Sequence, residues 1–593
     1  MISLGINAAF HDSAATLVID GRVVAAAEEE RFTRIKHGKR PLPFTAWELP
    51  FHAIDYCLAE ADLTLADVDH VAYSYDPARF LRDRVPEGRL TLPLQPSAHD
   101  KGVWENVWDP LFAAYIVNAP RQLADGAPHH LKKRFAGVTH DGPYRFHFVD
   151  HHLCHQASAF LASPFERCAV MTLDGRGEEA TTSYGVYREQ HYAPLGEVCM
   201  PHSLGMLYEQ ITSYLGFLHS SDEYKVMALA ALGTPRFRGV LEEHIRIGAD
   251  GQYEIAPMDL AALFGPPRER GGAMDPRYLD LAASLQVVLE ETVLRLARWL
   301  REASGEPLLA MAGGVALNCV MNARLRDAGL FDQVWVQPAA GDAGTALGAA
   351  LWIDSQARVR DGADTPWTHD EKGSRIAERR WQMDHAYLGP GHEDDAIEVF
   401  LKWAKLPYQR LHDPAEATAR LLADNQVIGW YQGRMEFGPR ALGGRSIIAS
   451  PIEPAMQARI NELKDREDFR PVAPAIPREH LADWFTPAEA NGGSAPFMLF
   501  IYDVIEAQAK RIPAACHSDR TARVQTVTAD SNPRFHALLE AFGALTGVPV
   551  LINTSFNVRG EPVVCTPKDA IDAFYSTPID ALVIGSFLLE KSR

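Results

Sequence analysis

The sequence AVMTLDGRGEEATTSYGVY, at Ala169–Tyr187, contains the pattern from which the fold can be predicted. Two strand-like runs flank an Asp-Gly-x-Gly turn, which is typical of a strand–turn–strand unit. The same pattern opens the chain, where apolar runs at Ile2–Asn7 and Ala15–Ile19 are followed by an Asp-Gly turn and by Arg22–Ala27. This recurrence indicates an internal duplication.

Two later stretches change from strand-like to helix-like sequence through glycine and other small residues. They are LLAMAGGVALNCVMNARL at Leu308–Leu325 and VWVQPAAGDAGTALGAALW at Val334–Trp352. Glycine at such a junction lets a ligand approach the backbone closely. Paired strand–turn–strand units followed by strand–glycine–helix units are the layout of an actin-like ATPase, with nucleotide between two related halves. We therefore predict an α/β fold with a duplicated actin-like domain, and generic α/β packing is the alternative.

A polar stretch at residues 356–380 predicts a linker, because it is highly charged and has almost no apolar periodicity. We expect the actin-like domain at residues 1–355 and a separate α/β domain at 381–593. Residues 76–147 are rich in Pro, Trp, Asp and Arg without a clear period, and they predict an insertion in the first domain. Covering a substrate site and stabilising the domain are equally open roles for it.

The composition limits the partners and the compartment. The net charge of −19 opposes long-range attraction of nucleic acid. Seven scattered cysteines without a CxxC pair argue against a disulfide framework or a thiolate zinc site. The N-terminus lacks signal-peptide features, and no apolar run reaches the roughly 18 residues of a membrane span. We expect a cytoplasmic protein with neither a nucleic-acid nor a membrane partner.

Two histidines four residues apart form the first candidate site. His151 and His155 in HHLCHQASAF would share one helix face, within reach of a single metal ion. Asp174 and Asp342 follow strand-like runs, where side chains point toward a ligand cleft. Two imidazoles with one or two carboxylates suit Fe(II), Mn(II) or Zn(II). Buried or capping histidines and turn aspartates are the alternatives.

A second candidate lies near the N-terminus, in the segment FHDSAA. His11 is of a type that titrates near neutrality, and Asp12 beside it would hold its tautomer and raise its basicity. His11 is therefore a candidate general base. A capped turn with a solvated histidine is the alternative.

Basic residues gather in the C-terminal part of this acidic chain, each next to glycine, proline or apolar residues. Arg binds phosphate oxygens through two parallel hydrogen bonds and Lys supplies a point charge, so we predict a pocket for a phosphorylated substrate. A set of structural ion pairs is the alternative. Ser555 and Asn557 follow an apolar run and could add neutral donors. The basic residues are Arg434, Arg440, Arg445, Lys464, Arg466, Arg470 and Arg523.

Together these segments resemble the NodU/CmcH-type O-carbamoyltransferases, which modify nodulation factors and antibiotics. One departure is KVMALAALG at Lys225–Gly233, where the family usually reads close to KVMGLAPYG. The resemblance covers nearly the whole chain except the insertion and the linker. It runs in order through HDSAA, EEERFTRIKH, HHLCHQASAF, LDGRGE, GMLYEQIT, KVMALA, AGGVALN, PAAGDAGTALGAA, GRMEFGPRALGGRSI, DFRPVAP, RVQTV and NTSFN.

The resemblance implies a fusion of two domains, one similar to the tRNA threonylcarbamoyl transferase and one similar to threonylcarbamoyl-AMP synthase. In the C-terminal site, carbamoyl phosphate would be cleaved to carbamate, which attacks the α-phosphate of ATP to give carbamoyl-adenylate and pyrophosphate. The adenylate would then move to the N-terminal site. There the carbamoyl group would pass to a hydroxyl of a sugar or secondary metabolite, as in antibiotic biosynthesis.

The resemblance also implies roles for single residues. His151, His155, Asp174 and Asp342 match metal-binding positions, with Fe(II) as the expected ion. His11, with Asp12 beside it, falls where a base would take the proton of the acceptor hydroxyl. The implied partners are carbamoyl phosphate, ATP with Mg²⁺, and a small hydroxyl acceptor, and a homodimer is a further candidate assembly. Gly313, Gly314 and Asn318 would line the adenosine pocket, and Arg440, Lys464, Arg470, Arg523, Ser555 and Asn557 match the C-terminal ligand positions.

Three other functions stay open. Transfer of threonylcarbamoyl to tRNA is disfavoured by the net charge of −19 and the lack of a basic tail. A non-catalytic actin-like regulator that binds ATP would need neither the histidine pair nor the phosphate pocket. A metallopeptidase is disfavoured because HExxH is absent from the sequence.

Overall fold

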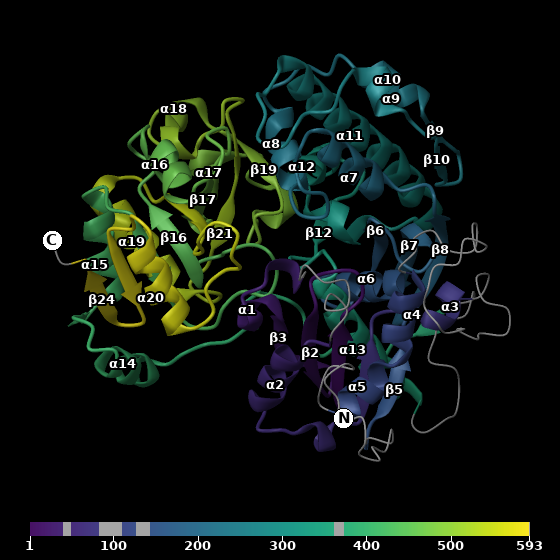
Figure 1. Cartoon of the computed structure of the whole chain (residues 1–593), viewed down its shortest axis with the longest axis horizontal. Helices are drawn as coiled ribbons and strands as arrows, with labels where there is room; N and C mark the ends of the chain where they lie inside the picture. The colour runs from purple at the N-terminus through teal and green to yellow at the C-terminus, as the bar shows by residue number, and fades with distance from the viewer. Residues whose placement is uncertain (39–48, 82–108, 126–142, 361–372, 592–593) are drawn as a thin grey trace. The chain divides into compact units, whose positions relative to one another are not determined.

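Figure 1 shows the computed structural model of the chain. Most of the predicted insertion and the middle of the predicted linker lie outside the residues that can be described. No helix among the described residues has the length and apolar character that crossing a membrane requires. The described residues are 1–38, 49–81, 109–125, 143–360 and 373–591.

The chain forms two compact units, each made of several segments. The first contains Met1–Gly205, Ser304–Ala316 and Trp335–Met383, and the second contains Met206–Ala303, Leu317–Val334 and Asp384–Arg593. Met206–Ala303 and Leu317–Val334, both within the expected first domain, are thus part of the second unit. The domain boundaries at residues 355 and 381 stay a prediction.

Two sheets built around the first unit repeat one topology, with strand orders β3-β2-β1-β4-β5 and β8-β7-β6-β11-β12. In each, an antiparallel three-stranded meander is extended beyond its first strand by a parallel strand, β4 beside β1 and β11 beside β6. The short strand β13 joins the second sheet next to β8. The structure therefore confirms the duplication and the α/β class predicted for an actin-like domain.

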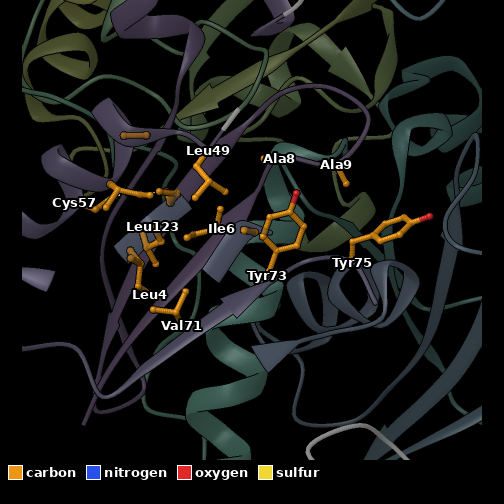
Figure 2. Packing of buried hydrophobic residues seen from close by; sticks show 14 of the residues in the cluster. Leu4, Ile6, Ala8, Ala9, Leu49, Cys57, Val71, Tyr73, Tyr75 and Leu123 are labelled. Carbon is orange, nitrogen blue, oxygen red and sulfur yellow. Dashed lines mark hydrogen bonds between the residues drawn. The ribbon is translucent and has the colours of Figure 1, made fainter. Parts of the chain in front are cut away.

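The core of the first sheet is apolar on adjacent strands. Leu4 and Ile6 on β1 and Val71 and Tyr73 on β4 lie in one cluster and are at most 1% exposed (Figure 2). Burial of a side chain of this size contributes about 1.5–3 kcal/mol. Strand β1 is buried on both faces, which fits its mostly apolar sequence.

Two glycines let helix α13 pack closely on its neighbours in the first unit. A Cβ on Gly5 of β1 would lie 1.9 Å from the Ala346 carbonyl oxygen of α13. A Cβ on Gly348 of α13 would lie 1.8 Å from the Cys154 carbonyl oxygen of α6. These close contacts fix the position of α6, the helix that contains the paired histidines.

We expect Gly348→Ala to destabilise the first unit by about 3 kcal/mol or more, because overpacking costs about 1–3 kcal/mol and the obstacle here is backbone. The corresponding fall in Tm is about 5 °C or more by circular dichroism. Gly239→Ala is the matched helical control, since nothing lies within 4 Å of its added Cβ. An unchanged Tm for Gly348→Ala would contradict the close contact of α6 with α13.

The second unit contains an eight-stranded sheet with the order β14-β24-β23-β15-β16-β22-β17-β21. All its strands come from the part of the chain after residue 381, where we predicted a separate α/β region. Ile447 on β16, Ile552 on the adjacent strand β22 and Leu582 on β23 are 0% exposed in its core. Smaller sheets pair β9 with β10 and order β18-β19-β20.

The bounds of the regular elements are as follows. The strands are β1 (Ile2–Asn7), β2 (Ala14–Ile19), β3 (Arg22–Glu28), β4 (His70–Tyr73), β5 (Arg145–Phe148), β6 (Cys168–Leu173), β7 (Ala180–Arg188), β8 (His191–Cys199), β9 (Ile245–Ile247), β10 (Tyr253–Ile255), β11 (Leu308–Ala312), β12 (Gln333–Val336), β13 (Ser374–Arg375), β14 (Gln409–Arg410), β15 (Ile428–Tyr431), β16 (Arg445–Ala449), β17 (Ala473–Pro477), β18 (Phe485–Thr486), β19 (Ile501–Val504), β20 (Thr521–Arg523), β21 (Gln525–Val527), β22 (Leu551–Ser555), β23 (Ala581–Ile584) and β24 (Phe587–Glu590). The helices are α1 (Glu30–Thr33), α2 (Phe51–Ala59), α3 (Pro77–Leu81), α4 (Asp109–Val117), α5 (Ala119–Asp125), α6 (His151–Phe160), α7 (Leu204–Tyr214), α8 (Glu223–Ala230), α9 (Arg238–Glu243), α10 (Leu260–Phe264), α11 (Pro276–Ser304), α12 (Cys319–Asp327), α13 (Ala343–Arg360), α14 (Asp394–Trp403), α15 (Pro414–Ala423), α16 (Met456–Leu463), α17 (Leu481–Trp484), α18 (Glu506–Ala509), α19 (Pro533–Thr546) and α20 (Pro567–Ser576).

Candidate functional site

Helix α6 presents the histidine pair in the first unit. It begins after Asp150, whose side chain caps the helix by accepting a hydrogen bond from the Leu153 amide at 2.8 Å. His151 and His155 are both 0% exposed. Asp174 follows β6 and Asp342 precedes α13, so the fold brings the four predicted ligands together from three segments.

The four side chains form a compact group. His151 Nε2 lies 3.7 Å from Asp174 Oδ2 and 3.6 Å from Asp342 Oδ1. His155 Nε2 lies 3.8 Å and 3.7 Å from the same two oxygens. In a tetrahedral site with bonds of about 2.1 Å, donor atoms are about 3.4 Å apart. The spacing therefore fits a metal ion between them.

Hydrogen bonds around the group also fit a metal centre. His151 Nδ1 donates a hydrogen bond to the Ser74 carbonyl oxygen at 3.1 Å. The proton is therefore on Nδ1, and the lone pair of Nε2 can bind a metal ion. Within the described residues, the Nε2 atoms of His151 and His155 are buried without a hydrogen-bond partner. Buried polar atoms are normally satisfied, so these nitrogens fit the role of metal ligands. The group could hold a divalent metal ion.

The glycine turn after β11 supports the same centre. The Gly314 amide donates to Asp174 Oδ1 at 2.8 Å, which leaves Oδ2 to face the histidines. Gly313 has φ of +93°, and a Cβ there would lie 2.2 Å from the Leu173 carbonyl oxygen. Asn318, predicted with these glycines, belongs to the second unit, where it caps α12 and donates to Gln286 at 2.9 Å.

The predicted base lies beside the metal group. His11 Nδ1 is 2.9 Å from Asp12 Oδ2, and His11 Nε2 is 3.8 Å from Asp342 Oδ2. The other oxygen of Asp12 lies 2.8 Å from Nδ1 of His37. Burial alone would raise the pKa of Asp12, but the two histidines outweigh it and hold that pKa well below its ordinary value. Asp12 therefore orients His11.

Sequence reasoning missed two residues of this centre. His37 ends the quoted segment EEERFTRIKH, but nothing in its spacing connects it with Asp12. Glu178 accepts hydrogen bonds from the amides of Asp76 at 2.6 Å and His151 at 3.0 Å. Burial, and then the charge of Asp150, raises the pKa of Glu178 to about 8. Glu178 thus anchors the start of α6.

Four arginines, Arg440, Arg466, Arg470 and Arg523, gather in the second unit. Burial, and then repulsion within the group, lowers the pKa of Arg440 and Arg466, and burial also lowers that of Arg523. Within the described residues, Arg440 Nε, Arg466 Nη2 and Arg523 Nε are buried and have no hydrogen-bond partner. Mutually repelling cations with unfilled donors are the features of an anion site. We call this group the arginine pocket.

The remaining predicted C-terminal ligands also lie together. Lys464 Nζ donates to Ser555 Oγ at 2.9 Å and to Asn557 Oδ1 at 2.6 Å. Ser555 stands at the end of β22, and its hydroxyl donates to Asn557 Oδ1 at 2.8 Å. Lys464 is therefore held in place by two neutral side chains whose oxygens accept its hydrogen bonds.

Two of the seven predicted basic residues, Arg434 and Arg445, make hydrogen bonds that stabilise the fold. Arg445 is 0% exposed and donates to the carbonyl oxygens of Gln432 at 3.0 Å and Pro390 at 2.8 Å. Arg434 donates to the Gly389 carbonyl oxygen at 3.1 Å. These hydrogen bonds go to backbone carbonyl oxygens, so the two arginines have a structural role, although not the ion pairs of the alternative.

We expect inorganic phosphate to stabilise the second unit, because an anion would fill the unpartnered donors of the arginine pocket. Binding at about 100 times its Kd contributes about 2.7 kcal/mol, which raises Tm by several degrees. Differential scanning fluorimetry with and without phosphate measures this shift. Sodium chloride at matched ionic strength is the control, and an equal shift in both salts would contradict a specific anion site.

Comparison with known proteins places these sites in a family context. Residues 2–351 match the family described as Carbamoyltransferase N-terminus, and residues 419–591 match Carbamoyltransferase C-terminus. An uncharacterised Synechocystis protein is 39% identical across 99% of this chain and 96% of its own. The nodulation protein NolNO of Sinorhizobium fredii is 36% identical across 99% and 80%. A 3'-hydroxymethylcephem-O-carbamoyltransferase of Amycolatopsis lactamdurans is 33% identical across 63% and 66%.

Proposed function

Because the chain belongs to the carbamoyltransferase family, we propose that this enzyme activates carbamoyl phosphate with ATP and transfers the carbamoyl group to a hydroxyl of a small molecule. One observation carries the proposal: a buried His/Asp group and a pocket of repelling arginines occur in the same chain. The first suits transfer and the second suits activation of a phosphorylated donor.

In the activation step, the arginine pocket would bind the phosphate groups of carbamoyl phosphate and of ATP with its Mg²⁺. Water cleaves carbamoyl phosphate to carbamate and phosphate. A carbamate oxygen then attacks the α-phosphorus of ATP, and the bond from that phosphorus to the β-phosphate oxygen breaks. The products are carbamoyl-adenylate and pyrophosphate. Lys464, with Ser555 and Asn557, would add a fixed positive charge and neutral groups to the ligand site.

In the transfer step, His151, His155, Asp174 and Asp342 would hold a divalent metal, for which we propose Fe(II). When bound, such a metal stabilises the negative charge that develops on the leaving phosphate. Gly313, Gly314 and Asn318 stay proposed as residues of the adenosine pocket.

His11 would act as the base of transfer. Its Nδ1 lies 2.9 Å from Asp12 Oδ2, so Nε2, on the side of Asp342, would be the nitrogen that takes the proton of the acceptor hydroxyl. The hydroxyl oxygen attacks the carbamoyl carbon, the bond to the adenylate phosphate breaks, and AMP leaves. A protein site suits this chemistry because it keeps the labile mixed anhydride away from water.

For the acceptor, we propose a sugar or a secondary metabolite with a free hydroxyl. Support comes from the printed names of two relatives, one a nodulation protein and the other a carbamoyltransferase for a hydroxymethyl group of a cephem. The role of the chain would then be in natural-product biosynthesis.

The test is an incubation of the protein with ATP and carbamoyl phosphate, without acceptor, in which phosphate and pyrophosphate are measured. We expect release that depends on carbamoyl phosphate and falls at least about 100-fold in Arg470→Ala, because one preorganised donor contributes about that much. No release by the unmodified protein would contradict the activation step and favour the ATP-binding regulator.

A further inference from the structure

A histidine next to the arginine pocket has no role in the site described so far. His517 opens a turn in the second unit, in which its amide donates to the Thr521 carbonyl oxygen at 2.9 Å and the Arg520 amide donates to its carbonyl oxygen at 2.9 Å. Strand β20 follows and ends at Arg523. The turn therefore places His517 close to an arginine of the pocket.

Hydrogen bonds define the tautomer of His517. Thr521 Oγ1 lies 2.8 Å from Asp519 Oδ1, and an ionised carboxylate only accepts, so the hydroxyl proton points to Asp519. Thr521 Oγ1 also lies 3.2 Å from His517 Nδ1, which must then be the protonated nitrogen and the donor. The Nε2 atom consequently has the free lone pair.

This lone pair has no partner among the described residues. His517 Nε2 is a buried atom without a hydrogen bond, and so is Nε of Arg523. Burial outweighs the opposing charge of Asp519 and, with a smaller contribution from the positive charge of Arg523, lowers the pKa of His517 to about 4. The imidazole is therefore neutral at pH 7 and can accept a proton.

The other ionisable groups at the arginine pocket are less suited than His517 to accept a proton. Arginine keeps its proton at all ordinary pH values. Lys464 acts as a hydrogen-bond donor to the oxygens of Ser555 and Asn557, so it is not placed to accept a proton. Glu467 lies 3.0 Å from Lys225 and 3.9 Å from Arg470, so both carboxylate oxygens face cations.

We propose that His517 is the general base for the water that cleaves carbamoyl phosphate, an inference that rests on the proposed function. Nε2 takes one proton as the water oxygen bonds to the carbonyl carbon. The bond from that carbon to the phosphate oxygen breaks, and the imidazolium returns the proton to the departing phosphate. One carbamoyl phosphate and one water give one carbamate and one phosphate, so the step balances. Asp519 and Thr521 orient the ring.

The experiment compares His517→Gln with the unmodified full chain in ATP and carbamoyl phosphate without acceptor. General base catalysis contributes about 10²–10⁴-fold, so we expect kcat for phosphate release to fall by at least about 100-fold. The KM for carbamoyl phosphate should stay within about threefold, because the arginines that bind phosphate are intact. His480→Gln changes a partly exposed histidine of the same unit that faces Asp483 and Glu540. It is the matched control and should keep the kcat of the unmodified protein.

A second variant tests the orientation of the ring. Thr521→Val removes the acceptor of the Nδ1 proton and leaves Nε2 in place, so we expect a fall in kcat of roughly tenfold, smaller than for His517→Gln. Should His517→Gln fail to fold, an unchanged kcat in Thr521→Val would overturn the proposal.

The outcomes separate this inference from the proposed function. An unchanged kcat in His517→Gln would overturn the assignment of His517 as the general base and leave the proposed function intact. A raised KM with unchanged kcat would make His517 a binding residue and would also overturn the base. No phosphate release by the unmodified protein would overturn the proposed function, and the base with it.

Discussion

The His155→Ala variant is expected to lose its metal and its carbamoyl transfer while it keeps the activation of carbamoyl phosphate. His155 supplies one of four donor atoms that lie within 4.8 Å of one another, so its removal leaves three ligands. Loss of a residue that hydrogen-bonds to a metal ligand already lowers metal affinity or activity about 10–100-fold. Loss of the ligand itself should therefore lower them at least about 100-fold. The arginine pocket is untouched by this change.

Three measurements check this expectation. Metal content by mass spectrometry should fall from about one equivalent per chain toward zero, and carbamoyl transfer to an acceptor should fall at least about 100-fold. Release of pyrophosphate from ATP and carbamoyl phosphate should stay within about threefold of the unmodified protein.

His152→Ala is the matched control for this variant. His152 is buried on the same helix, but it lies outside the four ligands, and its Nδ1 is 2.9 Å from Ser183 Oγ. It should keep the metal. Full metal content in His155→Ala, or equal loss in both variants, would contradict the assigned ligand set.

Much of this centre could be predicted because its signals are local. His151 and His155 are one helical turn apart, and Asp174 and Asp342 each stand in a turn after a strand-like run. The duplicated strand–turn–strand pattern then indicates which strand ends belong together. Periodicity and turn chemistry suffice for such residues, since neighbours along the chain determine where they point.

The residues that could not be predicted depend on contacts that the chain makes at a distance. His37 meets Asp12 only through the fold, and Glu178 reads as an ordinary turn carboxylate although it accepts from the His151 amide. Arg445 and Arg440 stand in similar glycine-rich surroundings, yet Arg445 donates to backbone carbonyls. Flanking residues indicate burial, but they do not reveal which group a side chain meets.

For an arginine of the pocket, we expect one substitution to raise the stability of the protein and to lower its activity. Arg440 makes one long hydrogen bond to the Leu317 carbonyl oxygen at 3.4 Å, and within the described residues its Nε has no partner. Burial, and then the charge of Arg523, lowers its pKa. Arg440 is therefore costly to the fold without an anion, and we expect Arg440→Met to raise the stability of the ligand-free protein by about 1 kcal/mol.

The same change should remove activity. A preorganised donor aimed at developing charge contributes about 10²–10³-fold to kcat, so release of phosphate and pyrophosphate should fall by that factor in Arg440→Met. The stabilisation by inorganic phosphate should shrink as well. The order of the two Tm values is therefore expected to reverse, with the variant higher in plain buffer and the unmodified protein higher in phosphate.

Arg420→Met on α15 is the matched control, because that arginine is 67% exposed and pairs with Glu416 on the surface. It should change neither activity nor the response to phosphate, since exposed pairs contribute little. A lower Tm for Arg440→Met in plain buffer would show that Arg440 supports the fold as a structural cation. A raised Tm together with lost activity would show that the enzyme maintains its repelling arginines for the ligand and not for the fold.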